Sequence, residues 1–183
     1  MTDKTILITG GLGFIGQALF ARLLETGHNV RILDNLSNAS TTADDATAAG
    51  VNVRVGDIRD RSACDDAVDG VDGVIHLAAQ TSVLPSVEAP EIDLELNGFG
   101  TLNILSACNA AGVRRVVCAS SNAVVGLVEP PIHELMMPAP VSPYGATKLL
   151  AESYCRTFSE IHGMHANALR FANIYGPRSK KKG

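Results

Sequence analysis

A tyrosine and a lysine in this sequence have a spacing that would let them do acid–base chemistry together. Tyr144 and Lys148 are four residues apart in a segment with helical periodicity, so both side chains should project from one helix face. An ammonium group there favours the phenolate and should lower the pKa of Tyr144 towards neutrality. Ser121 follows a predicted strand, and its hydroxyl could bond a substrate oxygen while Tyr144 moves a proton. The trio predicts proton transfer beside a hydride acceptor, although an isolated Tyr–Lys spacing more often marks a solvated helix face.

Three glycines near the N-terminus have the spacing of a phosphate-binding turn. Gly10, Gly13 and Gly16 follow a short apolar run and open a helical segment, where missing β-carbons let a pyrophosphate approach the backbone. The glycines alone are a weak indicator, but Asp34 ends the second predicted strand 18 residues after Gly16. A carboxylate near that offset binds the ribose hydroxyls of an adenosine. Because Asp34 repels a 2′-phosphate and residues 35–37 include no Lys or Arg, the motif predicts NAD rather than NADP.

Other polar residues permit more than one interpretation. Asp57 and Ile58 end the third predicted strand and would reach the adenine, although Asp57 could instead cap the turn that follows. His76 lies at an apolar strand end and is predicted to be a hydrogen-bonded structural group rather than a ligand. The cysteines lack the spacing of a zinc site, so no metal is expected and a reducing compartment is inferred. They should be small buried apolar residues: Cys64, Cys108, Cys118 and Cys155.

Strand and helix patterns alternate along the chain and would bring these side chains to one edge of a sheet. Apolar, β-branched runs predict strands at residues 4–9, 30–33, 51–55, 74–77, 115–119 and 166–171. Helical or Ala-rich polar segments follow them at residues 14–24, 40–49, 61–69, 88–111 and 144–162. This alternation predicts an α/β fold, a doubly wound parallel sheet of the Rossmann type, with its ligand crevice at the carboxyl ends of the strands.

Composition and charge narrow the classes of partner. The chain has 183 residues, of which 46% are hydrophobic, so it can bury a core without disulfides or a structural metal. Residues 1–177 hold 11 basic against 19 acidic residues, which argues against nucleic acid as a partner. No apolar run approaches the length of a membrane span, and no secretory signal precedes Gly10. No membrane partner and a cytoplasmic location are therefore expected.

Several further motifs accompany these residues, and together they carry a family resemblance. They are TGGLGFIG (9–16), DNLSN (34–38), GDIRD (56–60), HLAAQ (76–80), Asn97 before GTLN (100–103), ASSNAVVG (119–126), SPYGATK (142–148) and LRFANIYGPR (169–178). On these motifs the chain resembles the extended short-chain dehydrogenase/reductases of the NAD-dependent epimerase/dehydratase family, and among them the nucleotide-sugar epimerases. The resemblance covers about residues 4–178.

The resemblance implies a tightly held NAD and a nucleotide-sugar substrate, with a UDP-hexose favoured. It assigns Tyr144 as catalytic base, Lys148 to the nicotinamide ribose and Ser121 to proton transfer. It also places Asn173 at the substrate diphosphate and Asn122 beside the substrate. The implied reaction is epimerisation through transient oxidation at C4 to a 4-keto sugar. The residues expected to contact NAD are Gly10, Gly13, Phe14, Ile15, Gly16, Asp34, Asn35, Asp57, Ile58, Leu77, Ala78, Ala79, Asn97, Tyr144 and Lys148.

Alternatives to an epimerase stay open at this point. One is a decarboxylase or reductase of similar substrates that uses the same residues, and another is an NAD-binding sensor or interaction module without turnover. Asn122 and Ala123 stand where related dehydratases carry an Asp-Glu pair, so dehydration is disfavoured. Val125 replaces the tyrosine usual in the family, which should change only packing or a substrate contact.

The segment 88–111 and the end of the chain bear on assembly and domain organisation. Apolar residues cover more than one face of the helix predicted there, and the family pairs this helix and the Tyr144 helix across a two-fold axis, so a homodimer is expected. A simple core helix is the alternative. Residues 1–176 are expected to form the NAD-binding domain, with 177–183 as a basic tail or the start of a truncated substrate region. The apolar residues are Leu94, Leu96, Phe99, Leu102 and Leu105.

Overall fold

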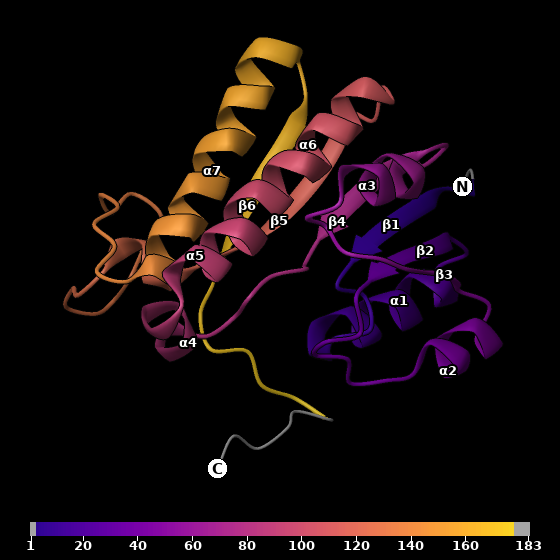
Figure 1. Cartoon of the computed structure of the whole chain (residues 1–183), viewed down its shortest axis with the longest axis horizontal. Coiled ribbons are helices and arrows are strands. Elements are labelled where there is room, and N and C mark those ends of the chain that lie inside the picture. The colour runs from indigo at the N-terminus through magenta and orange to yellow at the C-terminus, as the bar shows by residue number, and fades with distance from the viewer. Residues whose placement is uncertain (1–2, 178–183) are drawn as a thin grey trace.

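Six parallel strands form one sheet in the order β3-β2-β1-β4-β5-β6, as seen in a computed structural model that describes residues 3–177 (Figure 1). The chain runs outward from β1 in one direction and then returns to β4 on the other side, so the switch point lies between these two strands. This order confirms the expected doubly wound α/β fold. The strands are β1 (Thr5–Thr9), β2 (Asn29–Asp34), β3 (Asn52–Val55), β4 (Gly73–His76), β5 (Arg115–Ser121) and β6 (His165–Phe171).

The strand register brings the carboxyl ends together at one edge of the sheet. Thr9 at the end of β1 pairs with Leu33 on one side and with His76 on the other. Ser121 at the end of β5 pairs with Phe171 of β6. Because every strand is parallel to its neighbours, the segments that leave these ends converge on the same crevice.

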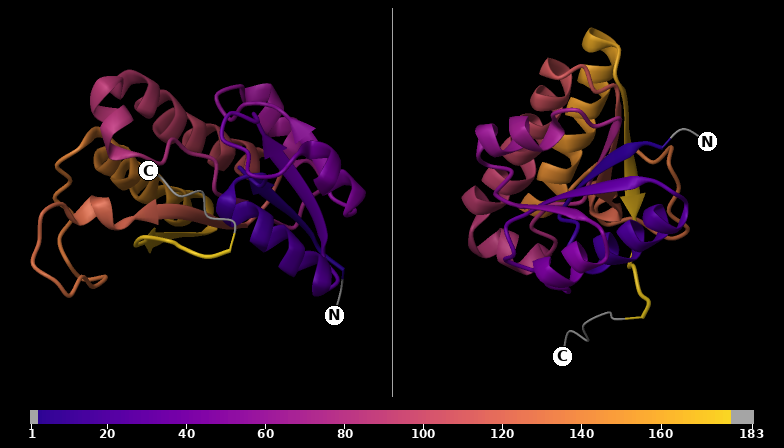
Figure 2. Two further views of the ribbon diagram at one scale, coloured as in Figure 1. Left: turned by 90° about the horizontal axis from the view of Figure 1, so that it is seen from below. Right: turned by 90° about the vertical axis from the view of Figure 1, so that its right-hand side faces the viewer.

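Helices cover both faces of the sheet, as Figure 2 shows. On one face α1 (Phe14–Glu25) and α2 (Ala43–Ala48) pack over β1 to β3, with Ile8, Phe20 and Ile32 in the apolar contact. The opposite face carries the larger core cluster, in which residues of three helices meet those of β1, β2, β4 and β5. These helices are α3 (Arg61–Val68), α6 (Gly100–Ala110) and α7 (Pro143–His162).

The helix predicted within residues 88–111 is confirmed, because helical residues run without a break from Pro90 to Ala110, with a π-helical turn inside the run. A short helix, α4 (Val83–Glu88), ends at Ala89, whose backbone leaves the helical region (φ −141°, ψ 72°) because Ala89 precedes a proline. Pro90 then starts α5 (Pro90–Asp93), which passes into a π-helical turn, η1 (Leu94–Phe99), before α6 begins at Gly100. A π turn widens the helix locally and is frequent at functional sites.

Three other expectations concern the whole chain. All four cysteines are free and buried, as predicted. No helix among residues 3–177 is long and apolar enough to cross a membrane. The segment expected to begin at residue 177 lies, except for Pro177, outside the described residues.

Candidate active site

The turn between β1 and α1 requires glycine at two positions. Gly10 has a φ of +66°, and a β-carbon there would lie 2.7 Å from the backbone nitrogen of Ala78 at the end of β4. A β-carbon on Gly16 would lie 2.5 Å from the Cα of Gly11, so α1 could not pack onto the turn. The N-cap of α1, Gly13, offers no side chain to the first turn. The backbone N–H groups at the start of α1 can therefore donate hydrogen bonds to an anion.

Asp34 ends β2 with its carboxylate held in place by the backbone. Oδ2 accepts a hydrogen bond from the N–H of Leu12 at 3.0 Å, and Oδ1 accepts one from the N–H of Leu36 at 2.9 Å. Asp34 is buried, but it lines the large cavity at the strand ends. Its remaining lone pairs can accept bonds from hydroxyls of a ligand in that cavity.

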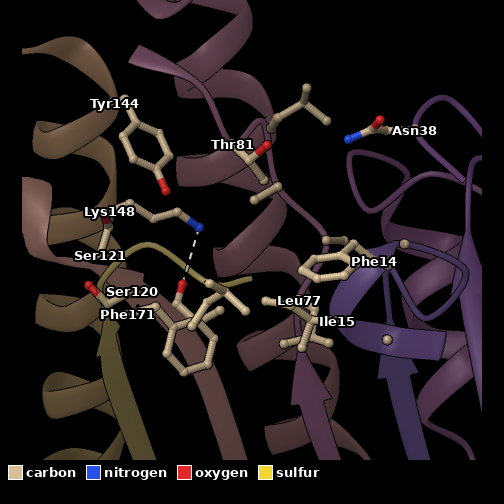
Figure 3. A pocket seen from close by; sticks show the side chains of 18 of the residues that line it. Phe14, Ile15, Asn38, Leu77, Thr81, Ser120, Ser121, Tyr144, Lys148 and Phe171 are labelled. Carbon is tan, nitrogen blue, oxygen red and sulfur yellow. Dashed lines mark hydrogen bonds between the residues drawn. The ribbon is translucent and has the colours of Figure 1, made fainter. Parts of the chain in front are cut away.

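A cavity of about 710 Å³ lies along the carboxyl edge of the sheet, between the glycine turn and α7. In Figure 3 the side chains of Phe14 and Ile15 lie on one side of it and those of Tyr144, Lys148 and Ser121 on the other. Nearly all the residues predicted from the sequence line it. They are Gly10, Gly13, Phe14, Ile15, Gly16, Asp34, Asn35, Ile58, Leu77, Ala78, Ala79, Ser121, Asn122, Tyr144, Lys148 and Asn173.

The sequence prediction missed part of the cavity wall. Asn38 and Ser40 line it from the loop after β2, and Thr81 lines it from the loop after β4. Ser120 and Phe171 contribute from the ends of β5 and β6. The rule that ligands bind beyond the carboxyl ends of the strands could have pointed to these loops, but no residue type singled them out.

Asp57 was expected to reach an adenine, but its side chain bonds within the protein. Oδ2 pairs with Nη2 of Arg59 at 2.9 Å and accepts from Nδ2 of Asn35 at 2.9 Å, while Oδ1 accepts from the N–H of Arg59. The bonds from Arg59 lower the pKa of Asp57 to about 2. Gly56 and Ile58 line the cavity, whereas Asp57 is not among its lining residues. The geometry matches the alternative in which Asp57 caps the turn.

Asn97 also lies behind the cavity wall rather than in it. The side chain is buried, and its Oδ1 accepts from the N–H of Gln80 at 2.9 Å while Nδ2 donates to the carbonyl of Gln80 at 3.1 Å. Nδ2 also donates to Asp93. These bonds position the loop after β4, whose residues Leu77 to Ala79 line the cavity.

Helix α7 begins so that its first two turns face the cavity. The hydroxyl of Ser142 caps the helix by accepting from the N–H of Gly145 at 3.1 Å, and Pro143 occupies the first helical position. Tyr144 and Lys148 then project into the same space, with Nζ of Lys148 5.8 Å from the centroid of the Tyr144 ring. Nζ donates to the carbonyl of Ala119 at 3.1 Å, the bond drawn as a dashed line in Figure 3.

Burial changes the protonation of both side chains. Lys148 is 6% exposed, and desolvation of its ammonium lowers its pKa to about 8. Burial also raises the pKa of Tyr144 above its usual value, which outweighs the lowering by a hydrogen bond with Ser121. The expectation that Lys148 would bring the pKa of Tyr144 towards neutrality is therefore wrong for this structure. The reason is that loss of water disfavours the phenolate more than its neighbours favour it.

His76 is a structural group, as predicted. Its Nδ1 lies 2.6 Å from Oγ1 of Thr9 and its Nε2 lies 3.1 Å from Oγ1 of Thr101. Complete burial lowers the pKa of His76 to about 3, so the ring is neutral at physiological pH. Among residues 3–177 no three His, Cys, Asp or Glu side chains are grouped as metal ligands would be.

The strand order, the glycine turn and the acidic end of β2 define a dinucleotide-binding domain of the Rossmann type, here with Ser, Tyr and Lys side chains in the same cavity. Residues 6–183 match the family model described as the NAD dependent epimerase/dehydratase family. The chain belongs to this family.

Proteins of known activity are similar to most of the chain. It is 36% identical to UDP-glucose 4-epimerase of Corynebacterium glutamicum over 93% of this chain and 51% of that protein. A crystal structure of Thermus thermophilus UDP-glucose 4-epimerase in complex with NAD is 36% identical, with a TM-score of 0.90 over 98% of this chain and 58% of that one. UDP-N-acetylglucosamine 4-epimerase of Methanobrevibacter ruminantium, in complex with UDP-N-acetylmuramic acid, is 33% identical, with a TM-score of 0.91 over 100% of this chain and 59% of that one. The chain thus spans somewhat more than half the length of these relatives.

Proposed function

We propose that the protein carrying this chain interconverts UDP-hexoses that differ at C4, with NAD as its resident cofactor. The observation that carries the proposal is the shared cavity, because the Tyr144 phenol, the Lys148 ammonium and the Ser121 hydroxyl meet the glycine turn and Asp34 there. The similar proteins named as UDP-sugar 4-epimerases support the choice of reaction.

The residues present fit NAD on two counts. A β-carbon on Gly10 or Gly16 would collide with backbone. The turn therefore has no side chains at these positions, and a pyrophosphate can come close to its backbone N–H groups. Asp34 presents a carboxylate to the cavity, and Asn35 and Ser37, its lining neighbours in the sequence, carry no positive charge for a 2′-phosphate. Asp57 and Asn97 would then contribute indirectly, by holding the loops on either side. When bound, NAD supplies a hydride acceptor and donor.

The side chains on α7 and β5 would handle the proton. The 4-hydroxyl proton of the sugar would pass to the phenolate of Tyr144 as the hydride leaves C4, which gives a 4-keto sugar. Return of the hydride to the other face of C4 and of the proton from Tyr144 would complete epimerisation. The Lys148 ammonium would stabilise the phenolate, Ser121 would bond the reacting oxygen, and Asn173 would bind the diphosphate.

The end of β5 favours epimerisation over dehydration. Ser121 is followed by the short 3₁₀ helix η2 (Asn122–Val125), whose N–H at Ala123 donates to the Ser121 hydroxyl at 3.1 Å. Neither Asn122 nor Ala123 carries an acid or base that could remove water from a sugar. The proposed site therefore moves one proton, through Tyr144.

The test is interconversion of UDP-glucose and UDP-galactose, and of their N-acetyl analogues, by the protein and its Tyr144→Phe variant. The variant should lose about 10²–10⁴ in rate while it still binds NAD, because only the proton acceptor is removed. Tyr154→Phe on the same helix, outside the cavity, is the matched control and should keep its rate.

Other products would contradict the proposal. Release of CO₂ from a UDP-uronic acid would identify a decarboxylase, and stoichiometric consumption of reduced cofactor would identify a reductase. Binding of NAD without turnover of any UDP-sugar would favour a sensor. A Tyr144→Phe variant with a near-normal rate would remove Tyr144 from the mechanism.

The proposal includes a homodimer and a cytoplasmic location. Apolar side chains are exposed along α4 and η1, among them Leu84, Val87 and Phe99. An exposed apolar surface of this kind is typical of an interface. Four free buried thiols suit a reducing compartment such as the cytoplasm.

A further inference from the structure

A buried carboxylate lies behind the wall of the cavity, where the mechanism does not use it. Asp93, at the end of α5, is 1% exposed. Its Oδ2 accepts from Oγ1 of Thr147 at 2.5 Å, and its Oδ1 accepts from Nδ2 of Asn97 at 3.0 Å. Thr147 lies on α7 between Tyr144 and Lys148. The carboxylate thus contacts the helix turn that carries both candidate catalytic side chains.

The bond to Asn97 continues as a buried network across the sheet. The backbone carbonyl of Asn97 accepts from the hydroxyl of Thr101 at 2.6 Å. Because the Thr101 hydroxyl donates its proton to this carbonyl, the same hydroxyl accepts from Nε2 of His76 at 3.1 Å. Nε2 therefore carries the ring proton, and Nδ1 of His76 accepts from the hydroxyl of Thr9 at 2.6 Å. Every side chain in this network has its partners, so Asp93 anchors α7 to the β1–β4 switch point through a rigid connection.

Lys148 needs a negative charge that its direct contact does not supply. Its ammonium is buried, its hydrogen bond is to the neutral carbonyl of Ala119, and among residues 3–177 no carboxylate lies within 4.0 Å of it. A buried charge without an opposite charge nearby is costly. Asp93 is a buried carboxylate on the element that packs against this turn of α7.

We propose that Asp93 is a positioning residue for catalysis, which holds the first turns of α7 through Thr147 and supplies the negative charge that keeps the Lys148 ammonium in the cavity. This rests on the proposed function, in which Tyr144 and Lys148 move the proton. The role differs from that of the cavity residues, because Asp93 does not line the cavity.

The charged groups around Tyr144 and Lys148 predict how the pKa values of these two side chains would change without the Asp93 charge. Asp93 raises the pKa of Lys148, as does Cys118 of β5, whereas burial lowers it. Asp93 also raises the pKa of Tyr144, which Ser121 of β5 lowers. His76 of β4 is neutral and adds no charge. Removal of the Asp93 charge should therefore lower the pKa of Tyr144 and of Lys148 together.

The test is the pH dependence of kcat for Asp93→Asn, which keeps the size of the side chain. Activity that needs a deprotonated Tyr144 and a protonated Lys148 has an acid limb and an alkaline limb, and both should move to lower pH by about one unit. The value of kcat should fall at least several-fold, with KM for the UDP-sugar little changed. Glu95→Gln is the matched control, because Glu95 lies on η1, is exposed and pairs with Arg59 at 3.7 Å. It should leave both limbs in place.

A pair of Thr147 variants keeps the proposal testable if Asp93→Asn fails to fold, and a titration adds a second readout if it folds. Thr147→Val removes the hydroxyl that Asp93 accepts from, and Thr147→Ser keeps it, so kcat should fall in the first variant and recover in the second. Ultraviolet titration of Tyr144, identified by its absence in Tyr144→Phe, should show a lower pKa in Asp93→Asn than in the unmodified protein.

The outcomes separate this proposal from the proposed function. Unmoved pH limbs and an unmoved Tyr144 titration in Asp93→Asn would overturn the role of Asp93, as would full activity of Thr147→Val. Failure of the unmodified protein to epimerise any UDP-sugar would overturn the proposed function instead. The tyrosine titration would then still decide whether Asp93 acts on Tyr144.

Discussion

Burial sets the protonation of the side chains that matter most in this site. It lowers the pKa of Lys148 to about 8 and that of His76 to about 3, and it raises the pKa of Tyr144. For Lys148 the consequence is functional, because its charge is lost as the pH rises through about 8. For His76 the consequence is structural, because the ring stays neutral between its two threonine partners.

Asp34→Asn should reduce the preference for NAD over NADP. The amide keeps the shape of the carboxylate and can accept from only one of the N–H groups of Leu12 and Leu36, but it no longer repels a 2′-phosphate. Fluorescence titration with NADH and NADPH should show the ratio of affinities fall by about tenfold or more, roughly 1.4 kcal/mol. Asp72→Asn, at the opposite, amino end of the sheet, is the control. Equal affinities for the two cofactors in the unmodified protein would exclude this role for Asp34.

His76 should make the protein less stable in acid. Its pKa is about 3 when folded and about 6.5 when unfolded, so the unfolded chain binds one more proton between these values. The free energy of unfolding from this residue should fall by about 1.4 kcal/mol for each pH unit below about 6. Urea unfolding at several pH values should show a shallower slope for His76→Gln, whereas exposed His165→Gln should match the unmodified protein. Identical slopes for all three would disprove this account.

At the scale of elements, two irregular connections shape the cavity. The glycine turn brings the start of α1 against the ends of β1 and β4. On the other side, the π turn η1 follows Asp93 and carries Asn97, so one irregular helix segment contacts both α7 and the loop after β4. The cavity therefore depends on elements that depart from regular geometry.

Gly16→Ala should weaken NAD binding, whereas a glycine variant elsewhere with a similar loss of stability should not. Its β-carbon would lie 2.5 Å from the Cα of Gly11, so the turn must shift, at a cost of about 1–3 kcal/mol. Gly70→Ala is the matched control, because Gly70 has a φ of +67° with open space around it and should lose about 1–2 kcal/mol for conformational reasons alone. Calorimetric titration with NAD should show weaker binding only for Gly16→Ala. Unchanged affinity would mean that the turn does not hold the pyrophosphate.

At the scale of the molecule, one stretch of exposed apolar surface lies on α4 and η1, which both contact α7. Leu84 on α4 is 75% exposed and Phe99 at the end of η1 is 57% exposed. In Figure 1 α4 and α5 lie together beside the first turns of α7. A partner that covered this surface would also support the helix on which Tyr144 and Lys148 lie.

Leu84→Glu should convert the proposed homodimer into a monomer, because a charge would have to be buried in the interface. Analytical ultracentrifugation at micromolar concentration measures the change in mass. Leu135→Glu, at a side chain 92% exposed in the loop between η2 and α7, should leave the dimer intact. A monomeric unmodified protein, or a dimeric Leu84→Glu variant, would contradict this assembly.

Local patterns in the sequence were enough to predict the sheet, most of the helices and sixteen of the thirty residues that line the cavity. Strand alternation with helices, the glycine spacing and the acid that ends β2 depend on neighbours along the chain, and the parallel topology then brings the strand ends together. The Tyr144–Lys148 spacing needed only one helix to put both side chains on one face.

Only the tertiary structure decided which polar side chains enter the cavity and how they are charged. Asp57 bonds to Arg59 and Asn35, and Asn97 bonds to the loop after β4, although the sequence places Asp57 at a strand end and predicts that both residues contact NAD. Asp93 meets Thr147 across 54 residues of chain, a contact that no local pattern encodes. The direction of the Tyr144 pKa depends on how much water the folded chain removes from the phenol. Spacing along the sequence determines which side chains share an element, whereas their partners and solvation depend on packing between elements.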